Sequence, residues 1–440
     1  MRKNVLLGFV LLTCCCVAAL DRQPNADYRA RRVALSQKAD GGVVLLFAST
    51  EDEGPNGVYG FKQDNDFFYL TGWNEPGAAL LIAPEAKASD GNPARPYTEI
   101  FFLPAHNRTQ ERWTGPKLGP EDGPARQVTG FDRVESLDQM REELVKILPQ
   151  PRATVFTQEG PSSKSKTPLA WLRRANAFAT RVVMEEVDKL LTPMRMVKDR
   201  GEMERLQHAV DASVAAHLAA MRAMKPGMKE YEIAALIQFE YEKRGCERPA
   251  YASIVGSGVN GTVLHYSDNS ATIRDGDDVV IDAAGEYAEY ASDITRTLPA
   301  NGKFTPRQRE IYNIVLGAQQ AAAAAFVAGK SKLSGPGSLT EVAKQYIDSH
   351  GKDLHGEPLG KYFIHGIGHH VGLHVHDADN REPVDRGMVF TIEPGIYIPE
   401  EKIGVRIEDM FWVDPNGKLV QLSAKLPQTA EDVERTMAAH

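Results

Sequence analysis

A cluster of histidines near the C-terminal end of the sequence is the strongest chemical signal in the chain. Five of the 12 histidines lie within the twelve residues from His365 to His376, interleaved with glycines. Because glycine disfavours a continuous helix, this segment does not match the helical HExxH arrangement of many zinc peptidases. A single histidine here would more often be structural, whereas five in one short segment favour a metal site or a catalytic site.

Four acidic residues lie at the ends of short apolar segments, or within them, as β-strands would place them. They are Asp282, Asp293, Glu393 and Glu408. Asp282 follows the β-branched run 279–281, and strands joined by a turn at Gly285 could bring Asp293 onto the same face. An acid in an apolar strand costs free energy unless it is paired, hydrogen-bonded or bound to a metal. Each Asp alone would more often be a turn or surface residue, so a metal centre is predicted only if other ligands join the pair.

The elements that must position these side chains indicate an α/β fold in two domains. In the first half, strand-like segments separated by Gly and Pro alternate with charged, helix-compatible segments. The expected strands are 43–49, 67–70, 78–83 and 99–103, and the helix-compatible stretches are 133–147 and 166–191. Further on, apolar residues recur at three- and four-residue spacing, which predicts helices at 199–224, 229–244, 306–329 and 338–349. We place the domain boundary near Pro193.

The first twenty residues have the pattern of a secretory signal peptide. Arg2 and Lys3 precede an uncharged apolar run, and small residues at the −3 and −1 positions predict cleavage after Ala19. A short membrane anchor is the main alternative, although the run is shorter than the ~20 residues that a span needs. A lipoprotein signal at Cys14 and a misplaced start codon are further alternatives. With a genuine leader the protein is exported, and without one it is cytoplasmic.

Composition argues against several other classes of protein. The 51 Lys and Arg residues are outnumbered by 59 Asp and Glu residues, giving a net charge of −8, whereas nucleic-acid-binding proteins are usually basic. Only Cys246 remains after the predicted leader, which excludes an intramolecular disulfide and a zinc–cysteine site. The segment Gly256–Gly261 satisfies GxGxxG, but we expect a strand at Thr262–Tyr266 where a dinucleotide site needs a helix.

The order of the candidate ligands, with their flanking residues, resembles the metallopeptidase family of aminopeptidase P, prolidase and methionine aminopeptidase. The residues that carry the resemblance are Asp282, Asp293, His369, Glu393 and Glu408. It implies a C-terminal pita-bread catalytic domain, a pseudo-symmetric α/β (α+β) fold with a curved sheet around a two-metal site. The segments Asp66–Gly77, Phe101–Pro104 and Glu111–Gly115 resemble the N-terminal domain of aminopeptidase P, a creatinase/prolidase-like α/β domain. We therefore expect a signal peptide at 1–19, this domain at 20–190 and the catalytic domain at 191–440.

The resemblance also implies a role for each ligand. Asp282 would bind one metal ion, and Asp293 with Glu408 would bridge both ions. His369 and Glu393 would complete the second site. Four carboxylates and one imidazole are mostly hard oxygen ligands, which suit two divalent ions such as Mn²⁺. A hydroxide bridging the ions would attack the scissile carbonyl, with Glu393 as the proton shuttle.

Further residues match substrate-binding positions of the family. His265 and His376 correspond to catalytic histidines that hydrogen-bond the substrate and the tetrahedral intermediate, although a purely structural role stays open. Residues that line the proline pocket correspond to His365, Tyr397 and Arg406. Arg406 could equally be a salt-bridge partner for the acids. No role is assigned to His370 or His374.

The leading interpretation is an Xaa-Pro aminopeptidase, which hydrolyses the bond between an N-terminal residue and a following proline in peptides. A prolidase, which accepts only dipeptides, is the main alternative, and the N-terminal segments argue against it. A metal-free binding protein of the same fold is a third possibility, and the presence of all five ligands argues against that. The family also implies a homodimer or homotetramer. We expect no nucleic-acid partner and no stable membrane span.

Overall fold

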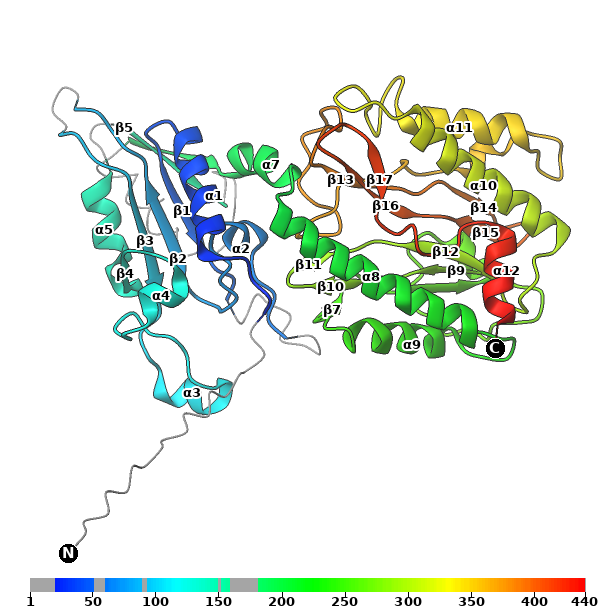
Figure 1. Ribbon diagram of the computed structural model, residues 1–440, viewed down its shortest axis with the longest axis horizontal. Coiled ribbons are helices and arrows are strands. Elements are labelled where there is room, and N and C mark those ends of the chain that lie inside the picture. Colours follow the sequence, from blue (N-terminus) through cyan, green and yellow to red (C-terminus); the bar gives the residue numbers. More distant parts are fainter. Residues whose placement is uncertain (1–19, 51–59, 89–92, 149–151, 159–180, 440) are drawn as a thin grey trace, which may run out of the picture.

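Two α/β units joined by one helix make up the described part of the chain (Figure 1). The computed structural model describes residues 20–50, 60–88, 93–148, 152–158 and 181–439, and the predicted signal peptide lies outside them. The connecting helix is α7 (Asp188–Met196), and the expected boundary at residue 190 falls within it. In the described ranges, no helix is both long enough and apolar enough to span a bilayer.

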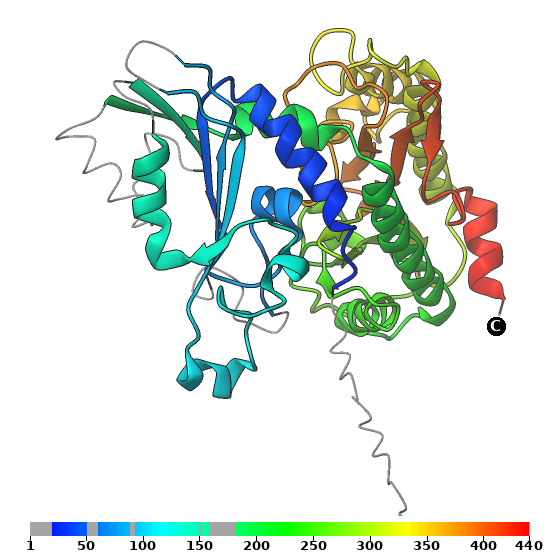
Figure 2. The same ribbon diagram turned by 60° about the vertical axis from the view of Figure 1, so that its left-hand side comes forward.

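The first unit is a six-stranded sheet with helices on both faces (Figures 1 and 2). The strand order is β4-β3-β2-β1-β5-β6, in which β2 runs antiparallel to both of its neighbours and the other pairs are parallel. Alternate residues of β1 serve the two faces, so Val44 and Leu46 pack with α1 and α2 while Val43 and Leu45 pack with α5. The elements of this unit are α1 (Asn25–Lys38), β1 (Val43–Phe47), α2 (Asn65–Thr71), β2 (Ala79–Ala83), β3 (Thr98–Leu103), α3 (Arg108–Thr114), α4 (Ala125–Thr129), β4 (Val134–Ser136), α5 (Met140–Ile147), β5 (Arg152–Thr157) and β6 (Arg181–Glu186).

One expected strand of this unit is a helix. Residues 67–70 lie within α2, so the prediction of a strand there is wrong. The Asp64 side chain caps this helix by accepting a hydrogen bond of 2.8 Å from the main-chain N of Phe67, and Gly72 ends it at φ 60°. Because every residue from 66 to 71 is buried, the segment has no polar face, and hydrophobic periodicity could not separate helix from strand.

Two further expectations need correction. Residues 181–186 of the stretch expected to be helical form strand β6, which pairs in parallel with β5, while residues 159–180 lie outside the described ranges. The strand expected at Thr262–Tyr266 is absent, because a short 3-10 helix (Gly258–Thr262) is followed there by a turn. A Cβ atom on Gly256 would lie 2.9 Å from the main-chain N of Gly261, so this glycine allows a close approach of main chain to main chain.

The second unit encloses short antiparallel sheets between pairs of helices (Figure 1). The α8–α9 pair lies on one side, the α10–α11 pair lies on the other, and α12 packs on α8. The sheets are β12-β9-β8, β13-β16-β17, β14-β15 and β11-β10-β7. The helices are α8 (Arg200–Ala223), α9 (Glu230–Glu242), α10 (Pro306–Ala325), α11 (Leu339–His350) and α12 (Ala430–Ala438). The strands are β7 (Arg248–Pro249), β8 (Ile254–Ser257), β9 (Asp278–Asp282), β10 (Gly285–Tyr287), β11 (Tyr290–Ala291), β12 (Thr295–Pro299), β13 (Val389–Ile392), β14 (Gly395–Ile398), β15 (Ile403–Arg406), β16 (Asp409–Val413) and β17 (Leu419–Gln421).

A buried ionic network joins the two units. Arg195 near the end of α7 pairs with Asp66 of α2 at 2.7 Å and also with Asp377 of the second unit. Lys198 Nζ lies 3.3 Å from the second oxygen of Asp377. These four side chains are buried, and Asp377 directly follows His376. The network therefore connects the first unit to a segment that carries a predicted catalytic residue.

Candidate active site

Neighbouring strands bring three of the predicted acids together. Asp282 ends β9 directly opposite Thr295 on β12, and Thr295 in turn forms a β-bridge with Glu408. The Thr295 hydroxyl donates a hydrogen bond of 2.7 Å to Glu408 Oε2. Asp293 precedes Thr295 by two residues, so the alternation of side chains directs it to the same side. The pairing of β9 with β12, together with the bridge from Thr295 to Glu408, thus gathers three carboxylates at one place.

His369 and Glu393 are positioned by a segment that runs beside β13. The main-chain N of Glu393 donates to the carbonyl of Ile367 at 2.8 Å, and that of Thr391 donates to the carbonyl of His369 at 2.9 Å. Gly368 is required here, because a Cβ atom would lie 2.0 Å from the Thr391 carbonyl oxygen. The Nδ1 atom of His369 lies 3.2 Å from the carbonyl oxygen of His370, which leaves Nε2 directed at the acids.

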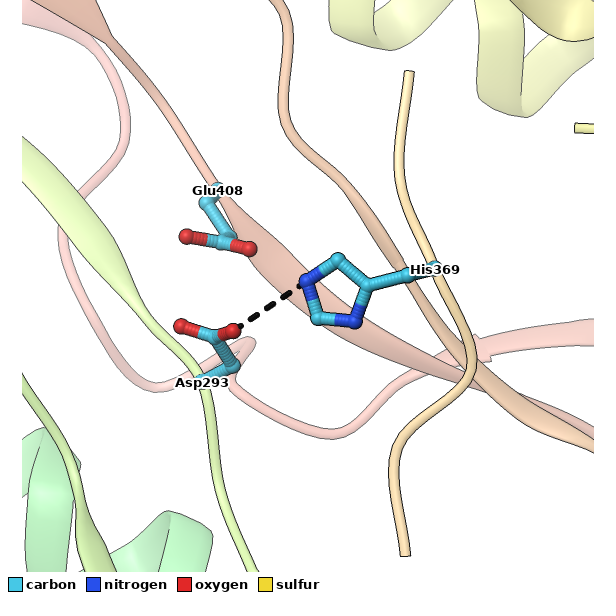
Figure 3. A group of neighbouring side chains, drawn as sticks. All are labelled: Asp293, His369 and Glu408. Atoms are coloured by element: carbon cyan, nitrogen blue, oxygen red, sulfur yellow. Dashed lines mark ion pairs between the residues drawn. The ribbon is translucent and has the colours of Figure 1, made fainter. Parts of the chain in front are cut away.

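The acids and His369 converge on one point (Figure 3). Asp293, His369 and Glu408 offer ligand atoms that all lie within 4.8 Å of one another. The Nε2 atom of His369 is 3.3 Å from Asp293 Oδ2 and 3.4 Å from Glu393 Oε1. Four of the five predicted metal ligands are therefore in direct proximity.

The electrostatics of the cluster fit a divalent metal centre. Burial, together with the charge of Asp293, raises the pKa of Glu408 well above its usual value, and Glu408 Oε1 has no hydrogen-bond partner among the described residues. Burial also raises the pKa of Glu393 to about 7. For His369, burial opposes the charged form, but the contacts with Asp293 and Glu393 outweigh it and raise the pKa to about 9. A cation would relieve the repulsion among these acids and bind the free oxygen of Glu408.

Asp282, the fifth predicted ligand, lies in the same cavity and is held by two other side chains. The Tyr251 hydroxyl donates to Asp282 Oδ1 at 2.6 Å, and Arg406 Nη2 donates to Oδ2 at 2.6 Å. Burial nevertheless raises the pKa of Asp282. Tyr251 was missed by the sequence reasoning, because a single tyrosine outside any motif carries no chemical signal. Arg406 is a salt-bridge partner of the acids, one of the two roles considered for it.

The cluster lines a cavity of about 470 Å³ in the catalytic unit. The wall of this cavity contains all five predicted metal ligands and most of the predicted substrate residues, namely His265, His365, His376 and Arg406. Tyr397 contacts two of these, since its hydroxyl accepts a hydrogen bond of 3.0 Å from Arg406 Nη1 and lies 2.8 Å from His365 Nε2. The cavity therefore places the predicted substrate residues beside the acids.

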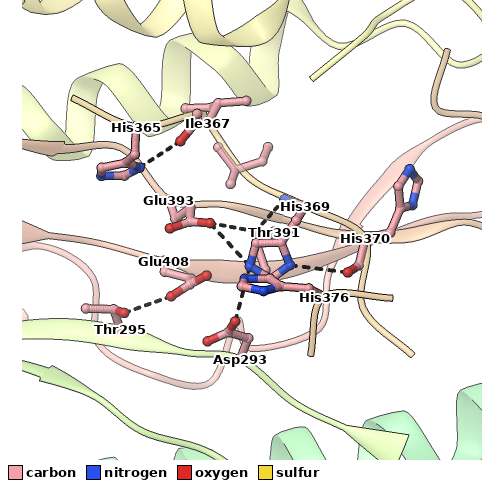
Figure 4. A network of polar contacts seen from close by, with 12 residues as sticks. Asp293, Thr295, His365, Ile367, His369, His370, His376, Thr391, Glu393 and Glu408 are labelled. Atoms are coloured by element: carbon pink, nitrogen blue, oxygen red, sulfur yellow. Dashed lines mark hydrogen bonds and ion pairs between the residues drawn. The ribbon is translucent and has the colours of Figure 1, made fainter. Parts of the chain in front are cut away.

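The remaining histidines of the cluster have distinct surroundings (Figure 4). His376 meets His369 edge to face, with ring centroids 4.2 Å apart. Burial lowers the pKa of His365 to about 4, so its ring is neutral at physiological pH. His370 is buried with its ring directed away from the acids. The Nδ1 atom of His374 lies 3.1 Å from the main-chain N of His376, so His374 shapes the turn that carries His376.

Comparisons with known proteins cover both units of the chain. Residues 204–415 match the model of metallopeptidase family M24, and residues 28–156 match that of the aminopeptidase P N-terminal domain. The Xaa-Pro aminopeptidase of Haemophilus influenzae is 32% identical, with 96% of this chain and 99% of the relative covered. The structure of E. coli aminopeptidase P with the inhibitor Pro-Leu matches with a TM-score of 0.82 and 31% identity, covering 95% of this chain and 99% of that one.

A prolidase relative is matched over a smaller region. The Xaa-Pro dipeptidase of Pyrococcus furiosus is 37% identical, but the match covers 53% of this chain and 65% of the relative. The aminopeptidase matches, by contrast, extend over both units of the described structure. The chain therefore belongs to metallopeptidase family M24 and, within it, to the aminopeptidase P group.

Proposed function

We propose that this protein is an Xaa-Pro aminopeptidase that releases the N-terminal residue from peptides with proline in the second position. The single observation that carries the proposal is the convergence of Asp293, His369 and Glu408 beside Glu393, in a cavity whose wall includes His365 and Arg406. Full-length similarity to proteins named Xaa-Pro aminopeptidase supports the same assignment.

The residues proposed to hold two divalent ions are Asp282, Asp293, His369, Glu393 and Glu408. Their predominance of carboxylate oxygen supports Mn²⁺ as the native metal. Divalent ions bound there would supply a water that ionises near neutral pH and would polarise the peptide carbonyl.

The protein's own residues supply proton transfer and substrate orientation. Glu393 takes a proton from the attacking water and returns it to the leaving proline nitrogen. His265 and His376 in the cavity wall donate hydrogen bonds to the substrate carbonyl as negative charge develops on its oxygen. His365, Tyr397 and Arg406 form a hydrogen-bonded row that borders the proline ring. Because an Xaa-Pro bond has no N–H, the enzyme must position this amide without that donor.

The proposal is tested with three peptides: Ala-Pro, Ala-Pro-Ala and Ala-Ala-Ala, each with added Mn²⁺. Cleavage of the Ala–Pro bond in the tripeptide supports it, whereas activity on the dipeptide alone would establish a prolidase. Equal cleavage of Ala-Ala-Ala would contradict the proline pocket. The Glu393→Ala variant is expected to lose activity by about 100-fold or more. Glu400→Ala is the matched control, because Glu400 is exposed and, in the part of the chain that the structure describes, pairs only with His355 at the surface.

The export, domain limits and assembly of the protein are proposed from the sequence pattern and from the family resemblance. The leader at 1–19 directs export, the N-terminal domain spans 20–190 and the catalytic domain spans 191–440. The protein assembles as a homodimer or homotetramer and uses no nucleic-acid partner. N-terminal sequencing of the purified protein tests the leader, and light scattering coupled to size-exclusion chromatography tests the assembly.

A further inference from the structure

His265 lies on a loop whose main chain alone determines where the imidazole is placed. Its imidazole is exposed at the cavity wall, and no hydrogen bond or ion pair to it occurs within the described ranges. The position of the ring therefore depends on the main chain of residues 257–271. This loop contains the short helix Gly258–Thr262 and a turn, and no strand pairing orders the residues around His265.

The carboxylate of Glu230, at the first position of α9, connects both ends of this loop. Before His265, Glu230 Oε1 accepts hydrogen bonds from Ser257 N at 2.8 Å, Ser257 Oγ at 2.7 Å and Asn260 Nδ2 at 3.1 Å. After His265, Glu230 Oε2 accepts from Tyr266 Oη at 2.8 Å and Ala271 N at 2.8 Å. The main-chain N of Glu230 also donates to the carbonyl of Ala271 at 3.1 Å. One buried side chain thus closes the loop on either side of the histidine.

The charge of Glu230 matters for this arrangement. Burial opposes the charged form, yet the hydrogen bonds from Ser257, Asn260 and Ala271 lower the pKa of Glu230, so the carboxylate is ionised at neutral pH. An amide in its place would turn an NH₂ group toward at least two of the five donors. Glutamine is therefore a close match in shape that cannot make the same contacts.

A second contact fixes only the first part of the loop. A Cβ atom on Gly404 would lie 2.0 Å from the carbonyl oxygen of Gly261, so the loop lies directly against β15 at that point. Beyond Thr262 this contact ends, and the rest of the path is held by the bonds from Tyr266 and Ala271 to Glu230. Asn269 adds a further anchor, since its Oδ1 accepts from Val255 N and its Nδ2 donates to the carbonyl of Ser253, both at 2.8 Å. Tyr266 is the immediate neighbour of His265.

We propose that Glu230 is a positioning residue for His265, which it holds at the cavity wall by tying down the loop on both sides. The inference rests on the proposed role of His265 in the proposed peptidase reaction. Glu230 itself does not line the cavity and touches no predicted metal ligand.

A double-mutant cycle tests this proposal. Glu230→Gln, His265→Ala and the double variant are prepared as full-length protein, and kcat and KM are measured on Ala-Pro-Ala with Mn²⁺. Glu230→Gln is expected to lower kcat/KM by about 10- to 100-fold, because small displacements of a catalytic group have effects of that size. In the His265→Ala background the same change is expected to cost less than about 3-fold. Glu232→Gln is the matched control, since Glu232 lies on the same turn and, among the described residues, its side chain bonds only to the main-chain N of Lys229.

The outcomes separate the two proposals. Equal losses from Glu230→Gln with and without His265, or no loss at all, would overturn the positioning role. Loss of bound Mn²⁺ in Glu230→Gln would do the same, because it would show general damage to the site. If Glu230→Gln does not fold, Tyr266→Phe replaces it in the cycle. This change removes one of the five donors to Glu230, the one that directly follows His265 in the chain. Failure of the wild-type protein to cleave any of the peptides would instead contradict the proposed function.

Discussion

Arg406 and Asp282 form an ion pair in the wall of the catalytic cavity, with Arg406 Nη2 2.6 Å from Asp282 Oδ2. Both side chains are buried, and Arg406 also donates to Tyr397 and Thr295. The guanidinium is the cation nearest to Asp282 in the metal-free cluster. It therefore couples the acid cluster to Tyr397 and His365.

Replacing this arginine should destabilise the metal-free protein. Arg406→Met leaves Asp282 buried beside other acids, and we expect a loss of about 3–5 kcal/mol in the free energy of unfolding. Bound Mn²⁺ should recover most of that loss, because the metal gives Asp282 a new partner. Urea denaturation with EDTA and with Mn²⁺ measures both effects. Arg386→Met, at an exposed pair with Asp385, should cost less than about 0.5 kcal/mol. An equal loss in the presence of Mn²⁺ would contradict the coupling.

The stabilisation of the folded protein by bound metal should increase as the pH rises. The pKa of Glu393 is raised from 4.5 to about 7 in the folded, metal-free protein, so the folded state binds protons more tightly than the unfolded chain. The stability that comes from this tighter proton binding is fully present below pH 4.5 and is lost as the pH rises through about 7. The loss lowers the free energy of unfolding by roughly 3 kcal/mol. His369, with a pKa raised from 6.5 to about 9, acts in the same direction between those values.

The melting temperature measured with EDTA should therefore fall between pH 5 and pH 8, while that measured with Mn²⁺ should change much less. Differential scanning fluorimetry across this range checks the prediction. If the difference in melting temperature between the Mn²⁺ and EDTA samples stays constant or narrows toward pH 8, the acids do not repel one another strongly in the metal-free protein.

Tyr251 should support metal binding although it is not a predicted ligand. Tyr251→Phe removes the hydrogen bond of 2.6 Å to Asp282 Oδ1, so the carboxylate loses one of the two contacts that orient it. We expect a 10- to 100-fold lower affinity for Mn²⁺, about the usual effect of removing such a contact. Isothermal titration calorimetry measures it. Tyr362→Phe, which removes a bond of 3.1 Å to Asp353 away from the cavity, should leave the affinity unchanged.

Asp278, at the start of β9, should be a source of instability at neutral pH. Its side chain is 1% exposed, and neither carboxylate oxygen has a hydrogen-bond partner in the described part of the chain. Burial raises its pKa well above 3.8, an effect that the nearby amides of Asp278 and Gly404 offset only in part. Asp278 therefore favours the folded state when its carboxyl group is protonated at low pH, and this advantage is lost as the pH rises and the group becomes charged.

Asp278→Asn removes the charge, so it should stabilise the protein at pH 8 by on the order of 1–3 kcal/mol. At pH 4 the two proteins should be closer in stability, because the aspartic acid is then protonated in the folded state and in roughly two-fifths of the unfolded chains. Urea midpoints at the two pH values decide the matter. A variant that is less stable at pH 8 would mean that Asp278 has a partner that favours its charge.

Sequence patterns predicted the elements of the catalytic unit better than those of the first unit. Helices α8 and α9 have apolar residues at helical spacing, and α8 begins with an Asp199–Glu202 capping box, so local signals and packing agree. The segment 67–70 has no polar face and depends on its caps at Asp64 and Gly72. Strand β6 needs β5 as a partner, and such a pairing between distant segments is not visible in the local sequence.

For the site, the residue types predicted the chemistry, but the contacts between them came from the fold. The acids and the histidine cluster stood out because acids in apolar strands and histidines among glycines are unusual, whereas the choice of His369 among the five histidines came from the resemblance to the family. Tyr251 and Glu230 could not be named, because each acts through a hydrogen bond to a residue that is distant in the sequence. The function of Arg406 as a partner of Asp282 also depended on β15 lying beside β9.

The Asp66–Arg195–Asp377 network has a consequence for any attempt to recombine this protein. The turn that carries His376 is linked through Arg195 to helix α2 of the other unit, so the surroundings of His376 depend in part on that unit. A chimaera that takes its N-terminal half from another protein would need an acid where Asp66 now lies. Without that acid, the Arg195 Nη1 group that now donates to Asp66 would be buried without a hydrogen-bond acceptor. The two halves should therefore be exchanged together, or the acid at this position should be kept.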